Sequence, residues 1–135
     1  MSKGYGAQGR LLAVGDKQIE YAYCSYNVNS SDYEETIDEL NGKLVLDISI
    51  FKTIDNYRRY KGASTDRERN QLKVKPDELN YTTLLEKGMV HIINSSKAWI
   101  LDDTGTDKLA IRLVSKIIEE YKRTEKIPET IGLFY

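Results

Sequence analysis

Residues 106–123 read TDKLAIRLVSKIIEEYKR and predict one long amphipathic helix. The apolar side chains of this segment lie along one side of the helix and form a stripe. Burial of this stripe, at about 1.5–3 kcal/mol for each larger side chain, is sufficient to dock the helix on a sheet. Thr104 and Asp107 have the spacing of a capping box at its start, with Asp in place of the usual Glu or Gln. The stripe consists of apolar residues at i, i+3, i+4, i+7, i+8 and i+11, namely Ala110, Leu113, Val114, Ile117, Ile118 and Tyr121.

Alternating apolar residues elsewhere predict the strands of that sheet, because successive side chains of a strand point to opposite faces. The first two strands flank the turn Gly15-Asp16-Lys17 and form a hairpin. A second hairpin turns between residues 93 and 98. The expected strands are 10–15, 19–26, 44–51, 72–74, 89–93, 98–101 and 131–135.

Residues 31–42, SDYEETIDELNG, fit two structures. Ser31 and Glu34 form a capping box ahead of a helical apolar face. Asn41-Gly42, in front of an alternating run, instead indicates a hairpin with a type I′ turn. The Asn-Gly pair favours the hairpin, and the helix stays an alternative.

Two shorter helices are predicted over 53–61 and 77–86, each followed by a glycine that ends it, Gly62 and Gly88. Residues 62–70, GASTDRERN, have almost no apolar side chain and predict an exposed loop. The predicted fold class is therefore α+β: a mostly antiparallel sheet with the amphipathic C-terminal helix packed on one face, plus one or two shorter helices.

The N-terminus contains a literal G-x-G-x-x-G over residues 4–9. A dinucleotide-binding loop needs a strand before this motif, a helix after it and an acidic residue about 20 positions later. Three residues precede Gly4, a strand-like run follows Gly9, and the first later carboxylate in range is Asp32. We therefore interpret residues 1–9 as a flexible tail.

Size and composition indicate one α+β domain over 10–135. The net charge of −1 favours neither nucleic acid nor an acidic partner for the molecule as a whole. Cys24 is the single cysteine, so no internal disulfide forms, which agrees with a reducing compartment. No apolar stretch approaches the roughly 20 residues of a membrane span. We expect a cytoplasmic protein with no membrane contact; the oligomeric state stays open.

Candidate catalytic residues are few. His91 lies in a predicted strand between apolar neighbours, and Cys24 has no cation near it in sequence, so both are expected to be structural. One Cys and one His do not build a zinc site, and no cofactor motif is present. Asp47 is expected to be a solvated carboxylate, and Trp99 a core residue. The sequence thus predicts no enzyme, no metal and no cofactor.

Charge segregates into two segments of opposite sign. Residues 27–42 carry −5, and residues 58–75 carry +5, from seven cations and two carboxylates. A partner-binding set is predicted in the first segment: Asp32, Tyr33, Glu34, Glu35, Asp38 and Glu39. An anion-binding or nucleic-acid-binding set is predicted in the second: Tyr57, Arg58, Arg59, Tyr60, Lys61, Arg67 and Arg69.

These observations favour a non-catalytic protein-binding module. The best-fitting type is a bacterial immunity or inhibitor protein that neutralises a toxin or nuclease through a charge-complementary surface. The alternative is a nucleic-acid-associated accessory protein that uses residues 57–75. A small enzyme with an unrecognised site, built on scattered carboxylates or on Cys24 and His91, is the third hypothesis.

Overall fold

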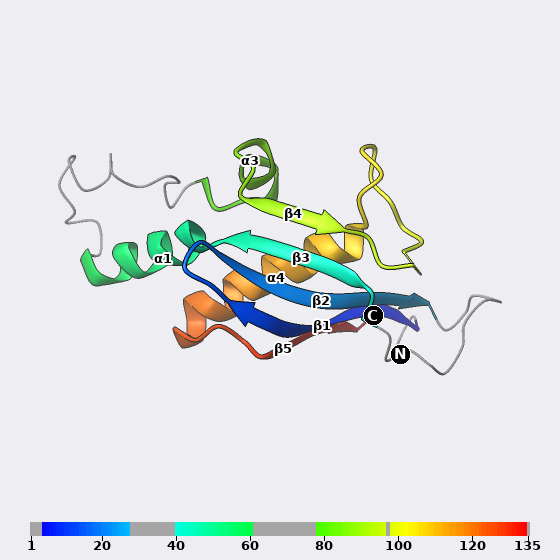
Figure 1. Cartoon of the computed structure of the whole chain (residues 1–135), viewed down its shortest axis with the longest axis horizontal. Helices are drawn as coiled ribbons and strands as arrows, with labels where there is room; N and C mark the ends of the chain where they lie inside the picture. Colours follow the sequence, from blue (N-terminus) through cyan, green and yellow to red (C-terminus); the bar gives the residue numbers. More distant parts are fainter. Residues whose placement is uncertain (1–3, 28–39, 61–77, 97, 135) are drawn as a thin grey trace.

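The computed structural model describes residues 4–27, 40–60, 78–96 and 98–134, and over 56–60 the backbone alone. Five strands form one antiparallel sheet in the order β4-β3-β2-β1-β5. Helix α4 covers one face of this sheet, and α1 and α3 pack beside it (Figure 1). The predicted α+β class is confirmed. The elements are β1 (Tyr5–Val14), β2 (Gln18–Asn27), β3 (Gly42–Asp47), α1 (Ile48–Tyr60), α3 (Tyr81–Glu86), β4 (Val90–Ile93), α4 (Lys108–Thr124) and β5 (Thr130–Phe134).

Strands β1 and β2 form the predicted first hairpin, but β1 starts earlier than expected. Tyr5 pairs with Asn27 of β2, and Gly6 pairs with Phe134 of β5. The prediction of a flexible tail over 1–9 is therefore wrong from Tyr5 onward. The glycine-rich motif belongs to a strand that has a neighbour on each side, where small residues allow close packing.

Gly42 is the first residue of β3 and pairs with Tyr23 of β2. Neither Asn41 nor Gly42 has the positive φ that a type I′ turn requires, so the predicted Asn-Gly turn is wrong. The Asn41 side chain is instead bonded to Ser96, donating to its hydroxyl at 2.6 Å and accepting from its amide at 2.9 Å. The choice between helix and hairpin arm falls largely on residues 31–39, which lie outside the described residues.

Strand β3 gives way to helix α1 without a loop. The expected strand over 44–51 is therefore wrong in its second half, and the helix expected from residue 53 begins at Ile48. The cause is Asp47, whose carboxylate accepts from Ser49 N at 2.8 Å, as an N-cap side chain does. Helical spacing directs three apolar side chains of α1 into the core: Ile50, Phe51 and Ile54.

The predictions over 61–77, which include the Gly62 stop, the exposed loop and a short strand, lie outside the described residues.

Helix α3 is shorter than predicted. It begins at Tyr81, later than the expected position 77, because the Asn80 side chain caps it by accepting from Thr83 N at 2.9 Å. The chain turns out of α3 at Gly88, whose φ of 69° is left-handed, so the predicted glycine stop is confirmed.

Strand β4 pairs with β3, and residues 98–101 do not form its hairpin partner. In this segment Leu101 makes an isolated bridge with Asp107. Trp99 is 42% exposed, and its ring meets that of Tyr5 edge-on at 5.3 Å. The predictions of a second hairpin and of a core tryptophan are therefore wrong.

Helix α4 confirms the strongest sequence prediction, since all six stripe residues are buried. Its N-cap is Asp107, whose carboxylate accepts from Leu109 N at 3.0 Å. The predicted capping box is wrong, because Thr104 donates to Asp102 instead. The core lies between α4 and the facing side chains of the sheet: Ala7, Ile19, Tyr21, Tyr23, Leu44, Leu46, Val90 and Ile131.

Candidate functional site

The two charged segments predicted from the sequence fall mostly outside the described residues. This holds for the acidic set, Asp32, Tyr33, Glu34, Glu35, Asp38 and Glu39, and for Lys61, Arg67 and Arg69 of the basic set. Strand β2 ends and β3 begins at one end of the sheet, whereas α1 extends beyond the other end (Figure 1). The two segments are therefore attached at opposite ends of the fold. The last turn of α1 carries Tyr57, Arg58, Arg59 and Tyr60.

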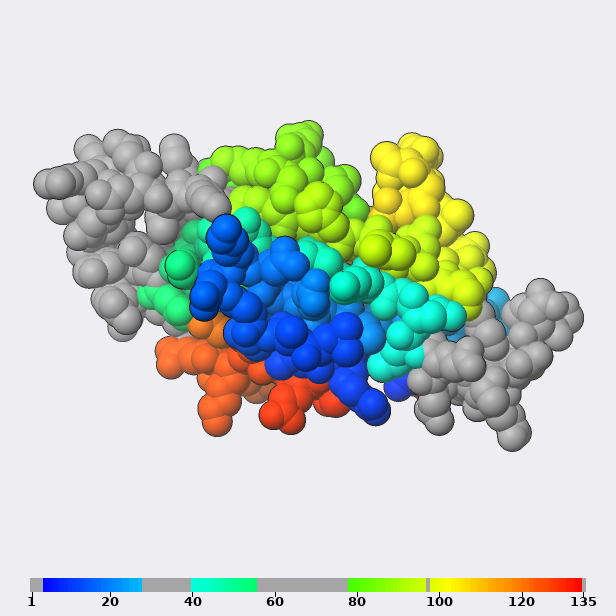
Figure 2. Space-filling model, in the orientation of Figure 1, coloured from blue at the N-terminus to red at the C-terminus, as the bar shows by residue number. Residues whose placement is uncertain are grey.

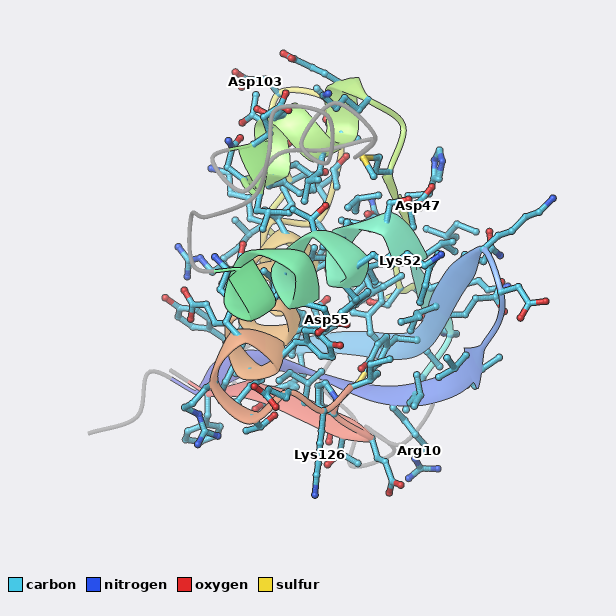
Figure 3. The ribbon with its side chains drawn as sticks, turned by 90° about the vertical axis from the view of Figure 1, so that its left-hand side faces the viewer. Arg10, Asp47, Lys52, Asp55, Asp103 and Lys126 are labelled. Atoms are coloured by element: carbon cyan, nitrogen blue, oxygen red, sulfur yellow. The ribbon has the colours of Figure 1, made fainter. Side chains whose placement is uncertain are left out.

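Helix α1 lies next to the C-terminal end of α4 (Figure 3). The Tyr121 hydroxyl donates to the Asp55 carboxylate, with oxygen distances of 2.8 and 2.9 Å. The Tyr121 ring also meets Phe51 edge-on, with centroids 4.9 Å apart. These contacts place Lys122 and Arg123 at the same end of the molecule as the basic turn of α1.

The side of α4 that faces away from the sheet is predominantly cationic, a feature that the sequence analysis did not single out. Arg123 pairs with Glu120 at 2.6 Å, and the remaining cations outnumber the one other carboxylate of the helix. This surface was detectable in the sequence as the polar complement of the apolar stripe. Its charged residues are Lys108, Arg112, Lys116, Glu119, Glu120, Lys122 and Arg123.

Cys24 and His91 lie apart. His91 is exposed on β4 and pairs with Val45, which pairs with Glu20 of β2. Cys24 lies four residues further along β2, about 13 Å away along the strand direction alone. The two side chains therefore do not form the Cys-His pair of a thiol nucleophile. Cys24 is buried, as expected.

A hollow of about 550 Å³ lies where the β1–β2 turn, the start of α1 and the start of β4 meet. Figure 3 labels Asp47 and Lys52, two of its lining residues. The first amides of α1 are bonded within the protein, since Ile48 N donates to Lys17 O at 2.9 Å and Ser49 N to Asp47. The hollow is thus an open polar surface with balanced charges and not a preformed anion site. Its charged and titratable lining is Asp16, Lys17, Asp47, Lys52 and His91.

A buried polar network, which the sequence analysis missed, joins β2 to the start of α4. The Tyr23 hydroxyl donates to Asp107 at 3.0 Å and accepts from Ser95 N at 3.0 Å. The Ser95 hydroxyl accepts from Ser25 N at 3.2 Å. Burial raises the pKa of the Tyr23 hydroxyl far above its ordinary value. Because these groups satisfy one another, the network is a structural tie. The sequence signal for it was limited to the cap position of Asp107.

The sheet face opposite α4 is covered by no helix among the described elements. Figure 2 views this open face, where β1, β2 and β3 reach the surface. At its borders Ile93 is 60% and Phe134 is 70% exposed. The Phe134 ring lies 6.5 Å from that of Tyr26. Between these borders Glu20 pairs with Lys43 at 3.3 Å. One row across the open face runs Ile93, Lys43, Ala22, Arg10 and Thr130.

Within the described residues, no three His, Cys, Asp or Glu side chains are grouped so that they could hold a metal ion. No described helix is both long and apolar enough to cross a membrane. Comparison of the chain with protein-family models, with curated proteins and with solved structures finds no significant match.

Proposed function

We propose that the protein is a non-catalytic protein-binding module. The observation that supports this function is the open sheet face with its exposed apolar borders at Ile93 and Phe134. Protein interfaces combine apolar and aromatic anchors with a polar rim. Phe134 and Tyr26 supply the aromatic pair, and the Glu20–Lys43 ion pair supplies polar contacts beside it.

The more specific proposal is a bacterial immunity or inhibitor protein that neutralises a toxin or nuclease. Its support is the −5 charge of residues 27–42. A nuclease binds phosphates with Lys and Arg, so its substrate surface attracts an acidic segment. Electrostatic complementarity of this kind accelerates encounter and excludes wrong partners.

The test is affinity purification of the tagged protein at low and high salt, followed by an inhibition assay on the captured protein. The expected result is one stoichiometric partner whose toxic or nuclease activity is blocked. Charge reversal at Asp32, Glu35 and Asp38 together should weaken that complex by more than about 1 kcal/mol. Retention of nucleic acid alone, with no protein partner, would contradict the proposal.

A second candidate is nucleic-acid binding, supported by the cationic side of α4 next to the basic turn of α1. The proposed site combines Arg58 and Arg59 with Lys122 and Arg123. Replacing all four with Ala should abolish retention of RNA or DNA and flatten the dependence of affinity on salt, because each neutralised phosphate releases counterions. A protein partner bound at the open face should be unaffected. Unchanged nucleic-acid retention would exclude this site.

A further inference from the structure

Strand β5 is an edge strand, paired with β1 on one side only. Leu11 N donates to Glu129 O at 2.8 Å, so this pair is hydrogen-bonded. Hydrogen-bonded pairs recur at every second residue of an antiparallel ladder, so Ile131 and Leu133 also bond to β1. The alternate residues therefore direct their N–H and C=O groups away from the sheet: Thr130, Gly132 and Phe134.

This outward edge is accessible. Thr130, Gly132 and Phe134 are all exposed, and β5 forms the lower border of the sheet in Figure 1. Within the described residues, one side chain bonds to the edge: the Lys116 ammonium of α4 donates to Gly132 O. The outward amides of this edge, and its carbonyls other than that of Gly132, have no partner among the described residues, and such an edge is a template for a further strand.

Lys116 determines what kind of strand fits. A second copy, paired antiparallel about Gly132, would bring two Lys116 ammonium groups together, and like charges repel. An incoming strand that carries a carboxylate on its α4 side would gain an ion pair with the same lysine. Its side chains on the other side would lie near Phe134 and Tyr26, which offer apolar contact.

We infer that the free edge of β5 binds an extended segment of a partner protein by strand addition, with an acidic side chain beside Lys116 and apolar side chains on the Phe134 side. In strand addition, main-chain hydrogen bonds supply the affinity, and contacts with alternate side chains of the added strand supply the selectivity. The inference rests on the proposed protein-binding function and specifies where and how the partner attaches.

Gly132 allows a sharp test. Its N–H points outward, so Gly132→Pro removes an edge donor without breaking the ladder to β1, and edge strands tolerate proline at such positions. Gly132→Ala is the matched control: it keeps the donor, and the added Cβ would come no closer than 4.0 Å to Ala7 O. The probes are capped peptides of about six residues. One alternates Val and Glu, the other Val and Lys, and both are used at millimolar concentration.

Binding is followed by the exchange rate of the Phe134 amide and by titration of its NMR shift. The Val-Glu peptide is expected to slow this exchange and to bind about 3- to 10-fold more weakly to Gly132→Pro than to Gly132→Ala, the range for a lost hydrogen bond. Lys116→Glu, which leaves the backbone of β5 unchanged, should reverse the preference in favour of the Val-Lys peptide.

Equal binding of the two peptides to the native protein, or no effect of Gly132→Pro in a variant that folds normally, would overturn the inference. Protection of the Phe134 amide that rises with protein concentration alone would also overturn it, in favour of a second copy. If strand addition fails while replacement of Ile93 still releases a captured partner, the proposed function stands and the partner uses the open face.

Discussion

Two tyrosines of β2 each lie against a glycine of a neighbouring strand. A Cβ atom on Gly42 would overlap with the Tyr23 ring and lie 2.7 Å from Ser95 N. On the opposite face, a Cβ on Gly6 would overlap with the backbone oxygen of Leu133 and come within 2.8 Å of the Tyr26 hydroxyl. An aromatic ring packed over a strand glycine covers backbone that would otherwise meet solvent, a known way to stabilise glycine in sheets. These glycines are explained by packing and not by backbone freedom.

Gly42→Ala is expected to lower the free energy of unfolding by about 1–3 kcal/mol, because the added methyl group overpacks the site against Tyr23. Urea denaturation followed by circular dichroism measures the change. Gly132→Ala serves as control and should cost less than about 0.5 kcal/mol, since it lies on an exposed edge. Equal effects of the two substitutions would show that the Tyr23 ring does not restrict position 42.

Buried tyrosine hydroxyls make stability sensitive to alkali. The Tyr21 hydroxyl donates to Pro128 O at 2.5 Å, and burial raises its pKa far above the ordinary value, as it does for Tyr23. In the unfolded chain both groups ionise near pH 10, whereas in the folded protein they stay protonated. The unfolded state therefore binds fewer protons than the folded state above that pH.

The free energy of unfolding should accordingly be constant with respect to these groups below about pH 10 and should fall as the pH rises beyond it. In a Tyr21→Phe, Tyr23→Phe variant the fall should be shallower, although the variant is less stable near neutral pH because it lacks the three hydrogen bonds that the two hydroxyls make. Denaturant unfolding at a series of pH values tests this. If the free energy of unfolding fell as steeply with pH in the variant as in the native protein, the alkaline loss of stability would not come from Tyr21 and Tyr23.

Among the elements, the direct passage from β3 into α1 depends on Asp47. Its carboxylate satisfies Ser49 N, and its own amide donates to Met89 O at 2.8 Å. One residue thus terminates a strand and caps a helix.

Asp47→Ala should reduce the free energy of unfolding by about 1 kcal/mol through loss of the cap, whereas Asp47→Ser should retain most of the stability because serine is also a good N-cap residue. Thermal and urea unfolding of the two variants provide the comparison. If serine proved as damaging as alanine, the carboxylate would be acting through another contact.

This junction also shows how far the sequence determines the fold. Helix α4 was predictable because its stripe repeats over three turns, longer than any chance alternation. Residues 44–51 alternate like a strand, yet Ile50, Phe51 and Ile54 also suit one helical face, so a short apolar run could not separate the two structures. In the folded protein, the N-cap at Asp47 decides between them in favour of the helix. The β5 edge was harder still to predict from the sequence. The pairing of β5 with β1 joins segments that lie far apart in the sequence and leaves no local pattern.

For the molecule as a whole, the consequence is a sheet with one dry face and one open face. Stability should depend on the first, and recognition is proposed to depend on the second. The two can be separated by substitutions of the same type on the two faces.

Replacing Ile93 and Phe134 with Thr should change the free energy of unfolding by less than about 0.5 kcal/mol for each site, since both are largely exposed. Ile131→Thr, on the dry face at 7% exposure, should cost about 2–4 kcal/mol, because it removes buried volume and buries a hydroxyl. Under the proposed function, the substitutions at Ile93 and Phe134 should reduce partner binding. Equal stability losses on both faces would mean that the open face is covered within the molecule.

The position of β5 beside β1 also governs when the protein can finish folding during synthesis. Phe134 leaves the ribosome 128 residues after Gly6, with which it pairs. At about 5–20 residues per second, β1 waits on the order of ten seconds for its second neighbour. Throughout that interval the nascent chain exposes a glycine-rich strand with one unsatisfied side, and translation speed becomes a determinant of yield.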